Sequence, residues 1–532
     1  MVGLRTNATS GSPGRETEVA IVGAGPAGCL FAAVLAEAGK AVTVLEAGPA
    51  WTLGDLISSQ IWARRLKWGG APVLRGGADP VGYAFANGWG FGGTALHHYG
   101  GWPRMRPEDF RMRSRFDRGV DWPIEYEILL PYYDRIQEDV GVAGDIGAEG
   151  WRPDNTPYPM PPVPATKQAQ IIARGFARMG RTVGPTPVAI NTVPYKGRRA
   201  CIYDGWCDAG CPIGALVIPQ VTYLPRAQAA GARFFAGMHV ARVMTDGRGR
   251  ATGLVYFDNE GKRHKILADV IVLAGAAVQN PRLLLNSASP THPDGLGNSR
   301  GLVGRYFVHH TIANIYGFFE EDLHNYIGLT VPTLESSDTY EKNRKDGPFG
   351  SYIWGIGMAF KPNDLLGLAT SRADIFGEDL HRFMRRATKY LGTMGAMCET
   401  LPDIDNRVEL AAETDRFGMP LARIVNRFSA DTSALWDHAS AEGLEIMRAA
   451  GAAESWAAPM ITTHALGGTR MGDDPAESVA DSYGRLHDVP NVYVAGGGLF
   501  PTIGAAAPTF TLHALALRAA ERLVADWSAH RG

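Results

Sequence analysis

Three glycines near the N-terminus have the spacing of a phosphate-binding turn. Gly23, Gly25 and Gly28 follow a β-branched run at 19–22 and open a helix predicted over about 26–38. In such a turn the first glycine permits the tight bend, the second lets the backbone approach a pyrophosphate, and the third packs the helix closely on the strand. The helix N-terminus then faces the phosphate charge.

The strand predicted after this helix ends in an acidic residue. Residues 41–45 form that strand, and Glu46 follows it. A carboxylate at this place accepts hydrogen bonds from both ribose hydroxyls and repels a 2′-phosphate. Strand, turn, helix, strand and acid together predict a βαβ unit that binds FAD or NAD rather than NADP.

A second glycine-rich stretch has the composition of a wall for a flat ring. Residues 87–104 read NGWGFGGTALHHYGGWPR, where six glycines alternate with aromatic residues and a histidine pair. Glycines let the backbone lie against a ring, while bulky side chains enclose it. The same composition also occurs in glycine-rich surface loops, which is the alternative for this stretch.

Length and composition limit what the chain can be. At 532 residues it exceeds the size at which one hydrophobic core stops growing, so two domains are expected. A net charge of −2 and a sequence without a basic run argue against nucleic acid as a partner. The 65 glycines in 532 residues exceed the roughly 7% of average proteins, which fits a backbone packed around a large cofactor.

The sequence also bears on location. No apolar run reaches the roughly 18 residues that a membrane-spanning helix needs. Residues 1–15 are polar and rich in Gly and Ser, which predicts a disordered tail and not a signal peptide. Five cysteines in a chain this long favour a reducing compartment. A cytoplasmic protein is therefore expected, with export alongside a partner as the alternative.

Later segments return to the nucleotide fold. The run 269–275 has the pattern of a buried strand, and Asn280 with Pro281 is expected to cap and open the helix after it. Residues 491–495 form another predicted strand, and Pro508 opens a long final helix. The nucleotide domain is therefore predicted to be discontinuous.

The middle of the chain has a different pattern. Residues 311–428 are rich in predicted strands, with a charged insertion at 335–347. A helix is predicted over 167–179, and another is expected to be capped by Asp431 and to run to about Ala450. This pattern predicts a second domain of sheet and helices, where substrate specificity would reside.

Motifs spread along the whole chain resemble the glucose-methanol-choline (GMC) flavoprotein oxidoreductases, in that family's order. They are GAGPAG with Glu46, the GGTALHH loop, NPRLLLNS, VGRYFVHH, HALGGTRMG and the C-terminal NVYVAGGGLFPTIGAAAPTFTLHALAL. DWPIEYEILLPYY, YPMPPVP and CPIGAL are similar to the branch that holds bacterial FAD-dependent sugar dehydrogenases and pyranose and glycoside oxidases.

The resemblance implies an α/β and α+β fold. It combines a discontinuous Rossmann-like FAD-binding domain with a substrate domain built on a mainly antiparallel or mixed sheet with covering helices. The expected FAD-binding domain comprises 16–150, 195–310 and 462–532. The expected substrate domain comprises 151–194 and 311–461.

Alcohol oxidation by a flavin requires few protein groups. A hydride passes from carbon to flavin N5 while the hydroxyl proton leaves, and the protein supplies a base within hydrogen-bond reach of that hydroxyl. His464 precedes Gly467 and Gly468, where backbone can approach the ring, and it matches the family's catalytic histidine. The alternative is a buried histidine bonded to backbone.

The family's second catalytic residue, His or Asn before the proline of the final helix, is Ala507 here. Alanine is also a poor helix N-cap, by about 1 kcal/mol relative to Asn. Either another side chain such as His98 or Tyr99 replaces it, or the alanine is a deliberate substitution. His513, six residues further along, is expected to have a packing role.

The resemblance and the motifs together predict the cofactor contacts. The helix N-terminus near Thr509 is expected to direct its positive dipole end at the N1/O2 edge of the flavin. His97 stands where some pyranose oxidases of the family carry a histidine covalently attached to the flavin, and packing against the ring is the alternative. The expected cofactor-binding residues are Gly23, Ala24, Gly25, Pro26, Ala27, Gly28, Glu46, Ala47, Gly92, Gly93, Thr94, His97, His98, Val240, Ala274, Gly275, Gly496, Gly497, Pro508 and Thr509.

Cys201, Cys207 and Cys211 have the spacing C-x5-C-x3-C-P. This resembles the three-cysteine spacing that binds a [3Fe-4S] cluster in bacterial FAD glucose dehydrogenases, where a cluster relays electrons from FAD to an acceptor. The alternative is a metal-free loop of reduced thiols. Cys29 on the first helix is expected to be a small core residue.

These features predict FAD-dependent oxidation of an alcohol, such as a sugar, glycoside or related secondary alcohol, to a carbonyl. Expected partners are the small-molecule alcohol and an electron acceptor, which is oxygen, a quinone or a cytochrome subunit. Aryl or lignin-type alcohols are a second substrate class, because Trp89, Trp102, Tyr99 and Phe91 could stack on a sugar face or an arene. Two other functions are alternatives. A non-redox FAD-containing lyase is compatible with Ala507, whereas the His464 motif and the large second domain argue against an electron-transfer subunit without a substrate of its own.

Overall fold

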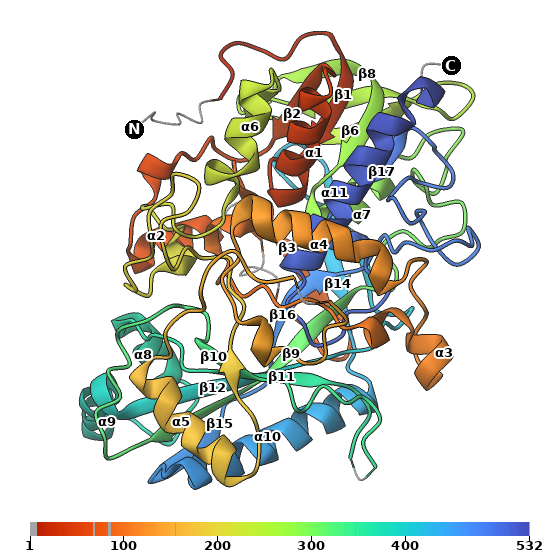
Figure 1. Ribbon diagram of the computed structural model, residues 1–532. Helices are drawn as coiled ribbons and strands as arrows, with labels where there is room; N and C mark the ends of the chain where they lie inside the picture. The colour runs from red at the N-terminus through yellow and green to blue at the C-terminus, as the bar shows by residue number, and fades with distance from the viewer. Residues whose placement is uncertain (1–7, 68–69, 83–86, 155, 346, 531–532) are drawn as a thin grey trace.

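The computed structural model of the chain describes residues 8–67, 70–82, 87–154, 156–345 and 347–530. Two lobes, each built around its own sheet, lie one above the other, and the first and last described segments of the chain lie at the upper lobe (Figure 1). Segments from the beginning, middle and end of the sequence meet in that upper lobe. The predicted combination of α/β and α+β architecture is confirmed.

The upper sheet holds the predicted βαβ unit. Its strands follow the order β5-β2-β1-β8-β7-β6, and β17 also pairs with β8. The pairs among β5, β2, β1, β8 and β17 are parallel, whereas β6, β7 and β8 form an antiparallel meander. The strands are β1 (Glu16–Val22), β2 (Val42–Glu46), β5 (Arg233–Ala236), β6 (His239–Thr245), β7 (Ala251–Phe257), β8 (Arg263–Leu273) and β17 (Val492–Val494).

Helices cover this sheet because its central strands are apolar on both faces. Val19, Ala20 and Ile21 in β1 are fully buried. Helix α1 packs against both α6 and α11, and α11 packs against α4. The helices of this lobe are α1 (Pro26–Glu37), α4 (Tyr126–Val140), α6 (Tyr223–Ala229), α7 (Ala276–Asn286) and α11 (Thr509–Ala525).

The lower sheet is antiparallel at every pairing between its described strands. Their order is β15-β9-β12-β11-β10-β4, and β16 also pairs with β9. Alternate residues such as Ala313 and Ile315 face a core shared with α5 and α10. The elements are β4 (Gly184–Pro185), β9 (Val308–Phe318), β10 (Leu334–Ser336), β11 (Tyr352–Ile356), β12 (Leu391–Cys398), β15 (Glu454–Ala457), β16 (Ile461–Leu466), α5 (Lys167–Arg178) and α10 (Ala430–Ala450).

A small third sheet lies beside these two. Strand β14 pairs antiparallel with β13 and parallel with β3. The charged helix α9 packs on α8 next to the end of β9. The remaining elements are β3 (Val73–Gly76), β13 (Arg407–Thr414), β14 (Pro420–Val425), α2 (Gln60–Lys67), α3 (Met112–Phe116), α8 (Pro362–Ala369) and α9 (Glu378–Tyr390).

Two of the expected domain boundaries fall within strands of the lower sheet. The boundary between 461 and 462 cuts through β16, where Thr462 pairs with Thr311 of β9, so the segment that carries His464 belongs to the lower sheet. Strand β9 itself begins at Val308, before the expected boundary at 311. Backbone pairing, which composition does not show, sets both limits.

The expected tail at 1–15 is described only from residue 8 onward. Within that part, the Thr9 N–H donates to the Phe234 carbonyl at 2.7 Å, so this segment is attached to the upper sheet at β5. Residues 1–7 lie outside the described residues.

Two predicted helix caps are wrong. Helix α7 begins at Ala276, so Pro281 lies inside it, and the Asn280 side chain instead accepts from the Gly275 N–H at 2.7 Å. Ser429, not Asp431, caps α10, because its hydroxyl accepts from the Thr432 N–H at 3.1 Å. Both helices begin before the predicted position: Asn280 bonds the N-cap residue of α7 from inside the helix, and Ser429 precedes Asp431 by two residues.

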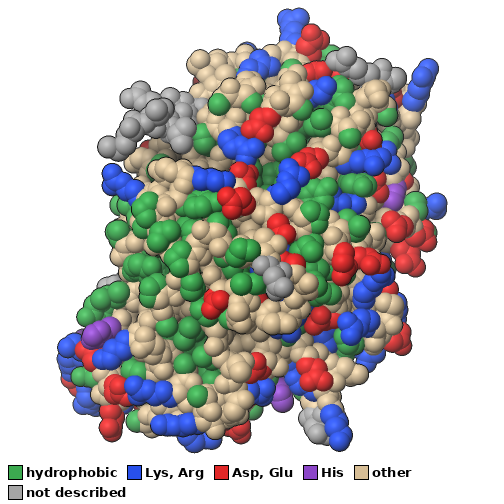
Figure 2. All heavy atoms as spheres, in the orientation of Figure 1, with side chains coloured by type: hydrophobic (Ala, Val, Ile, Leu, Met, Phe, Trp, Pro, Cys, Tyr) green, Lys and Arg blue, Asp and Glu red, His purple; other side chains and the backbone are tan. Residues whose placement is uncertain are grey.

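The surface agrees with the composition. On the face shown in Figure 2, Lys and Arg side chains are interspersed with Asp and Glu rather than gathered into one basic area. None of the helices in the described part of the chain is long and apolar enough to cross a membrane.

Candidate active site

A cavity of about 1460 Å³ extends from the turn after β1 to the exposed face of the lower sheet. Small-molecule pockets usually measure roughly 300–1,000 Å³, so this one has room for a dinucleotide together with a substrate. Both His464 and Ala507 line it. The predicted cofactor residues that line it are Gly23, Gly25, Pro26, Ala27, Glu46, Ala47, Gly93, Thr94, His97, His98, Val240, Ala274, Gly275, Gly496, Gly497, Pro508 and Thr509.

Three predicted cofactor residues, Ala24, Gly28 and Gly92, are not among the residues that line the cavity. Ala24 and Gly28 contact residues that do line it, and Gly92 bonds Ala24. The Ala24 N–H donates to Glu46, and the Gly92 N–H donates to the Ala24 carbonyl. A Cβ on Gly28 would lie 2.0 Å from the Gly23 carbonyl oxygen, so this glycine lets α1 start close behind the turn.

The glycine turn has the shape that a pyrophosphate requires. Gly23 has a φ of +102°, and a Cβ there would lie 2.7 Å from the Ala274 carbonyl oxygen. A Cβ on Gly25 would meet no heavy atom nearer than the Gly93 Cα at 4.0 Å, so its backbone is open to the cavity. The N-terminus of α1 with Pro26 at its first position therefore borders an open, glycine-lined cradle, which fits a dinucleotide phosphate.

Glu46 is buried and bound to backbone. One carboxylate oxygen accepts from the Ala24 N–H at 2.8 Å, and the other accepts from Gly48 at 2.8 Å and Gly90 at 3.0 Å. Burial raises the pKa of Glu46, and these N–H donors oppose that shift. The predicted ribose acceptor therefore also joins the glycine turn to the loop at 87–104, which the sequence pattern did not reveal.

The loop at 87–104 wraps the cavity as predicted, but its aromatic residues divide into two groups. Trp89 and Tyr99 line the cavity. Trp102 and Phe91 do not: both are fully buried in the core, where Trp102 packs on Phe510 and Phe91 packs on Phe234. The expectation that all four could stack on a substrate is therefore wrong for these two, because their rings fill the space behind the loop.

His464 reaches the cavity through an irregularity in β16. The pairing of β16 with β9 shifts register between Thr463 and Leu466, and His464 has a φ of +57°. A non-glycine residue in the left-handed region is strained by about 1–3 kcal/mol, and such strain concentrates at functional sites. The bulge turns the imidazole into the cavity, where burial lowers the pKa of His464 to about 4.

His310 on β9 contacts the imidazole of His464 at its Nδ1 atom. The two Nδ1 atoms are 3.1 Å apart, and His310 Nε2 is 3.1 Å from the Gly504 carbonyl oxygen. Burial, with His464 and Lys342 nearby, lowers the pKa of His310 well below its usual range, so it is neutral near pH 7.

The hydrogen-bond partners then assign the tautomers. A carbonyl only accepts, so His310 Nε2 carries the proton and its Nδ1 carries a lone pair. His464 must therefore donate from Nδ1, which leaves the lone pair of His464 on Nε2. This arrangement makes His464 Nε2 a proton acceptor.

A buried ionic cluster supports the segment that holds Gly504. The Lys342 ammonium lies 2.6 Å from Asp109 and 2.7 Å from Glu399, all of them almost fully buried. The Tyr340 hydroxyl donates to Asp109 at 2.6 Å and accepts from the Ala505 N–H at 3.2 Å. Burial alone would lower the pKa of Lys342, but the two carboxylates raise it, so the lysine stays charged.

The final helix begins at the cavity. Pro508 is its N-cap and Thr509 its first residue, so Ala507 lies one position before the cap and is not the cap itself. His513 bonds the Thr509 carbonyl at 2.7 Å and packs on Trp102 at 4.6 Å between ring centroids, which fits the packing role expected for it. His98 lines the cavity and bonds the Val217 carbonyl at 2.8 Å.

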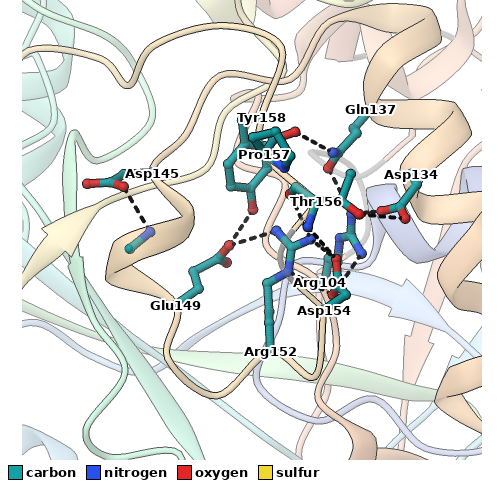
Figure 3. Close-up of polar contacts among 11 residues, drawn as sticks. Arg104, Asp134, Gln137, Asp145, Glu149, Arg152, Asp154, Thr156, Pro157 and Tyr158 are labelled. Atoms are coloured by element: carbon teal, nitrogen blue, oxygen red, sulfur yellow. Dashed lines mark hydrogen bonds and ion pairs between the residues drawn. The ribbon is translucent and has the colours of Figure 1, made fainter.

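Two buried arginines, Arg104 and Arg152, take part in a network of polar contacts beside α4 (Figure 3). Arg104 donates to Asp134 and Gln137 of α4 at 2.6 and 2.8 Å, and Arg152 binds Asp154 at 2.6 Å. The Arg104 guanidinium also lies over the Phe510 ring of α11, 5.4 Å from its centroid. The segment that holds Arg152 is bonded to α4 through Thr156, whose hydroxyl donates to Asp134 at 3.0 Å, and Arg104 contacts both α4 and the final helix.

The three cysteines of the C-x5-C-x3-C-P loop are free thiols. Burial raises the pKa of Cys201 to about 11 and that of Cys207 to about 12. Among the described residues, no group of three or more His, Cys, Asp or Glu is arranged to hold a metal ion. The thiols therefore do not fit a ready-made metal site. Cys29 is fully buried in the core, as expected.

Three residues of the site did not emerge from the sequence. His310 lies in the motif VGRYFVHH, and a histidine pair entering a buried strand was the one signal that could have found it. Lys342 and Glu335 lie in the stretch that looked like a charged surface insertion, yet Lys342 is buried and Glu335 lines the cavity. No local pattern distinguishes them from solvated charges.

Comparison with known proteins shows which family the chain is similar to. Residues 160–312 and 402–516 match the family profile described as GMC oxidoreductase, and residues 16–52 match the FAD binding domain. The chain is 32% identical to 2-methyl-1,2-propanediol dehydrogenase of Mycolicibacterium austroafricanum over 95% of each protein. It is 28% identical to the fructose dehydrogenase large subunit of Gluconobacter japonicus over 96% of this chain and 98% of that protein.

A third relative is paromamine 6′-oxidase of Streptomyces fradiae, 29% identical over 96% of this chain and 92% of that protein. Among solved structures, pyridoxine 4-oxidase from Mesorbium loti superposes with a TM-score of 0.63 at 19% identity, over 95% of this chain and 99% of that one. A formate oxidase superposes with a TM-score of 0.68 at 16% identity, over 98% and 100%. These two likenesses show the fold.

The glycine cradle, the histidine at the cavity and the match over nearly the full length agree. The chain belongs to the GMC oxidoreductase family and is an FAD-dependent oxidoreductase that acts on CH–OH groups.

Proposed function

We propose that the protein oxidises an alcohol group of a sugar, a glycoside or a related secondary alcohol to a carbonyl, with His464 as the base. The observation that carries the proposal is the chain from Gly504 through His310 to His464. It leaves an unprotonated nitrogen of His464 in a cavity that also contains the dinucleotide cradle.

The chain's own residues would hold FAD in three places. The turn at Gly23 and Gly25 with the N-terminus of α1 would bind the pyrophosphate, and Glu46 would accept from the ribose with its remaining lone pairs. Thr509 at the start of α11 would direct the helix dipole at the ring. Covalent attachment at His97, which lines the cavity, stays a prediction; release of all yellow colour by acid denaturation would exclude it.

The reaction requires one proton and one hydride to leave the alcohol. When bound, FAD supplies the hydride acceptor. His464 Nε2 accepts the hydroxyl proton, and the resulting charge on the imidazole is shared through Nδ1 with His310. A positioned base of this kind contributes roughly 10²–10⁴-fold to the rate.

The relatives named above favour polyhydroxyl substrates. Their names specify a diol, fructose and paromamine, which all carry alcohol groups. A sugar, glycoside or short polyol is therefore the proposed substrate class for this chain. Trp89 and Tyr99 in the cavity also suit an aryl alcohol, which belongs in the substrate screen.

The second polar group at the substrate hydroxyl is proposed to come from His98 or Tyr99, since both line the cavity and Ala507 has no polar atom in its side chain. Ala507→Asn tests this. An unchanged rate of flavin reduction supports a substitute group, whereas a large rise shows that the polar group is missing here.

The electron acceptor is proposed to be oxygen, a quinone or a cytochrome subunit, and no step is assigned to the cysteine loop. The [3Fe-4S] cluster stays a prediction from the spacing of Cys201, Cys207 and Cys211. Iron and acid-labile sulfide assays on the purified protein decide it. The cytoplasmic location likewise stays a prediction.

The central experiment is an anaerobic screen of sugars, glycosides and aryl alcohols against the FAD-loaded protein. Loss of the visible flavin absorption band identifies a substrate of the proposed reaction. Cleavage of a substrate with the band unchanged would support a lyase. A protein whose flavin no alcohol reduces would contradict the proposal.

A further inference from the structure

One face of the lower sheet forms a wall of the cavity. Along β9, β12 and β11 the residues of one parity, such as Ile312, Met397 and Ile353, line the cavity, whereas their neighbours enter the core against α5 and α10. The alternation follows from the two-residue period of a strand. Any polar side chain of this parity therefore points at the substrate space.

Two polar residues stand at opposite ends of one row across this wall. The pairing register places Asn314 beside Gly395, Gly395 beside Gly355, and Gly355 beside Glu335. All four residues line the cavity. Three strand spacings separate Asn314 from Glu335, which is about 14 Å.

The two residues in the middle of the row are glycines, so no side chain of theirs projects into the cavity. A Cβ on Gly395 would lie 3.0 Å from the Asn314 side-chain oxygen, and a Cβ on Gly355 would lie 2.5 Å from the Pro332 ring. The amide and the proline ring therefore occupy the places where side chains of the sheet would otherwise stand. This part of the sheet face, the floor of the substrate space, is therefore polar at Asn314, apolar at Pro332 and acidic at Glu335.

The Glu335 carboxylate is not used by the protein itself. Within the part of the chain that the structure describes, it forms no side-chain hydrogen bond or ion pair. Burial raises the pKa of Glu335 to about 8, the Glu149 carboxylate adds to the rise, and Arg106 opposes it. The Arg106 guanidinium is engaged elsewhere: it donates to the Ser337 carbonyl at 3.2 Å and lies 4.1 Å from the centroid of the Tyr340 ring.

We propose that Glu335 is a substrate-recognition residue that binds an ammonium group at the far end of an elongated, hydroxyl-rich substrate. The proposal rests on the proposed function and specifies its substrate class as amino-substituted glycosides. Thr463 of β16 pairs with His310, four residues before Asn314 on β9, so Glu335 lies roughly 20 Å from His464 along the sheet. A short alcohol held at His464 does not reach Glu335, whereas a chain of several linked sugar rings does, and a pair of rings covers the part of the sheet face next to Glu335.

The charges favour an amine over other ligands. A carboxylate or phosphate at this place would meet both Glu335 and Glu149. A neutral hydroxyl would leave Glu335 largely protonated near pH 7, whereas an ammonium would stabilise its ionised form and donate to it. Hydrogen bonds to charged groups are strong enough to change affinity by about tenfold or more.

The test compares two ligands that differ in the amino group. The β-1,4-linked dimer of glucosamine and its neutral counterpart cellobiose are titrated by calorimetry into FAD-loaded His464→Ala protein, which is expected to react about 10²–10⁴-fold more slowly than the parent. We expect the glucosamine dimer to bind about tenfold tighter. Adding Glu335→Gln should abolish that preference, while Glu341→Gln, which removes an exposed carboxylate nearby, should preserve it.

A kinetic arm separates this proposal from the proposed function. The Glu335→Gln substitution should raise KM for an amino glycoside about tenfold more than it raises KM for propane-1,2-diol, which is too short to reach residue 335, whereas Glu341→Gln should raise neither. Equal affinity for the two dimers, or a preference that survives Glu335→Gln, overturns the role of Glu335. Failure of every alcohol to reduce the parent's flavin overturns the proposed function, and the calorimetric result then still decides whether Glu335 binds amines.

Discussion

The two ends of the cavity are built from different kinds of atoms. At the nucleotide end, backbone forms the walls: Gly23 and Gly25 lack side chains, and Glu46 is held by three backbone N–H groups. At the substrate end, side chains such as His464 and Glu335 project from a sheet face. The first end fits a group shared by many enzymes, whereas the second can change its specificity by single substitutions.

The two ends also differ in how far apart their parts lie in the sequence. Gly23 to Glu46 spans one βαβ unit, while His464 bonds a histidine 154 residues away. A mutation at the nucleotide end should therefore affect cofactor binding, and one at the substrate end should affect rate with the cofactor retained. Four measurements test that division.

The largest effect is expected from His464→Ala. Removing the base should slow anaerobic flavin reduction by about 10²–10⁴-fold while the protein keeps its yellow FAD. Stopped-flow absorption measures the rate, and the visible spectrum measures the bound cofactor. Near-full activity in this variant would remove His464 from the mechanism.

At the nucleotide end, Gly28→Ala should weaken FAD binding by about 10–100-fold, because the new Cβ would lie 2.0 Å from the Gly23 carbonyl. Equilibrium dialysis of FAD measures the loss. Gly367→Ala is the matched control, since a Cβ there meets no atom within 4 Å and needs no unusual φ. Equal FAD affinity in both variants would contradict the close packing of the turn.

His310→Leu should slow flavin reduction by about tenfold, because the Nδ1 proton of His464 would lose its acceptor and the Gly504 carbonyl its donor. His310→Gln should restore most of the rate, since an amide both accepts and donates. Rates over a range of pH distinguish loss of positioning from general damage. If Leu and Gln are equally slow, the relay from Gly504 to His464 is not what sets the tautomer.

The smallest effect is expected from pH. Burial lowers the pKa of His464 to about 4, so the base stays unprotonated down to about pH 5. The rate of flavin reduction should change little between pH 8 and pH 5 and then fall as the pH drops through 4. A fall centred near 6.5, the ordinary value for histidine, would show that the imidazole is solvated in the working enzyme.

The difference between the nucleotide end and the substrate end also explains which residues could be predicted from the sequence. The glycine turn is a local pattern, and its spacing, helix and acid were all predictable from the run between β1 and β2. His464 was found because its motif resembles a family. Its partner His310 was not, because only the pairing of β16 with β9 brings the two rings together.

Glu335 shows the limit most clearly. Its neighbourhood contains Glu, Asp, Lys and Arg in a run that looks solvated, and only the register of four strands places it on the cavity wall. The two caps were wrong for a different reason, because each helix begins before the predicted position, so that Asn280 lies inside α7 and Ser429 takes the N-cap ahead of Asp431. Local chemistry was predictable, whereas the meeting of distant segments was not.

Catalysis by His464 requires the cofactor ring to lie beside its imidazole. An experimental structure of the FAD-loaded protein measures this directly. We predict a flavin ring between His464 and the N-terminus of α11, with the phosphates on the turn at Gly25. A ring bound at the other end of the cavity, far from residue 464, would contradict the proposed mechanism.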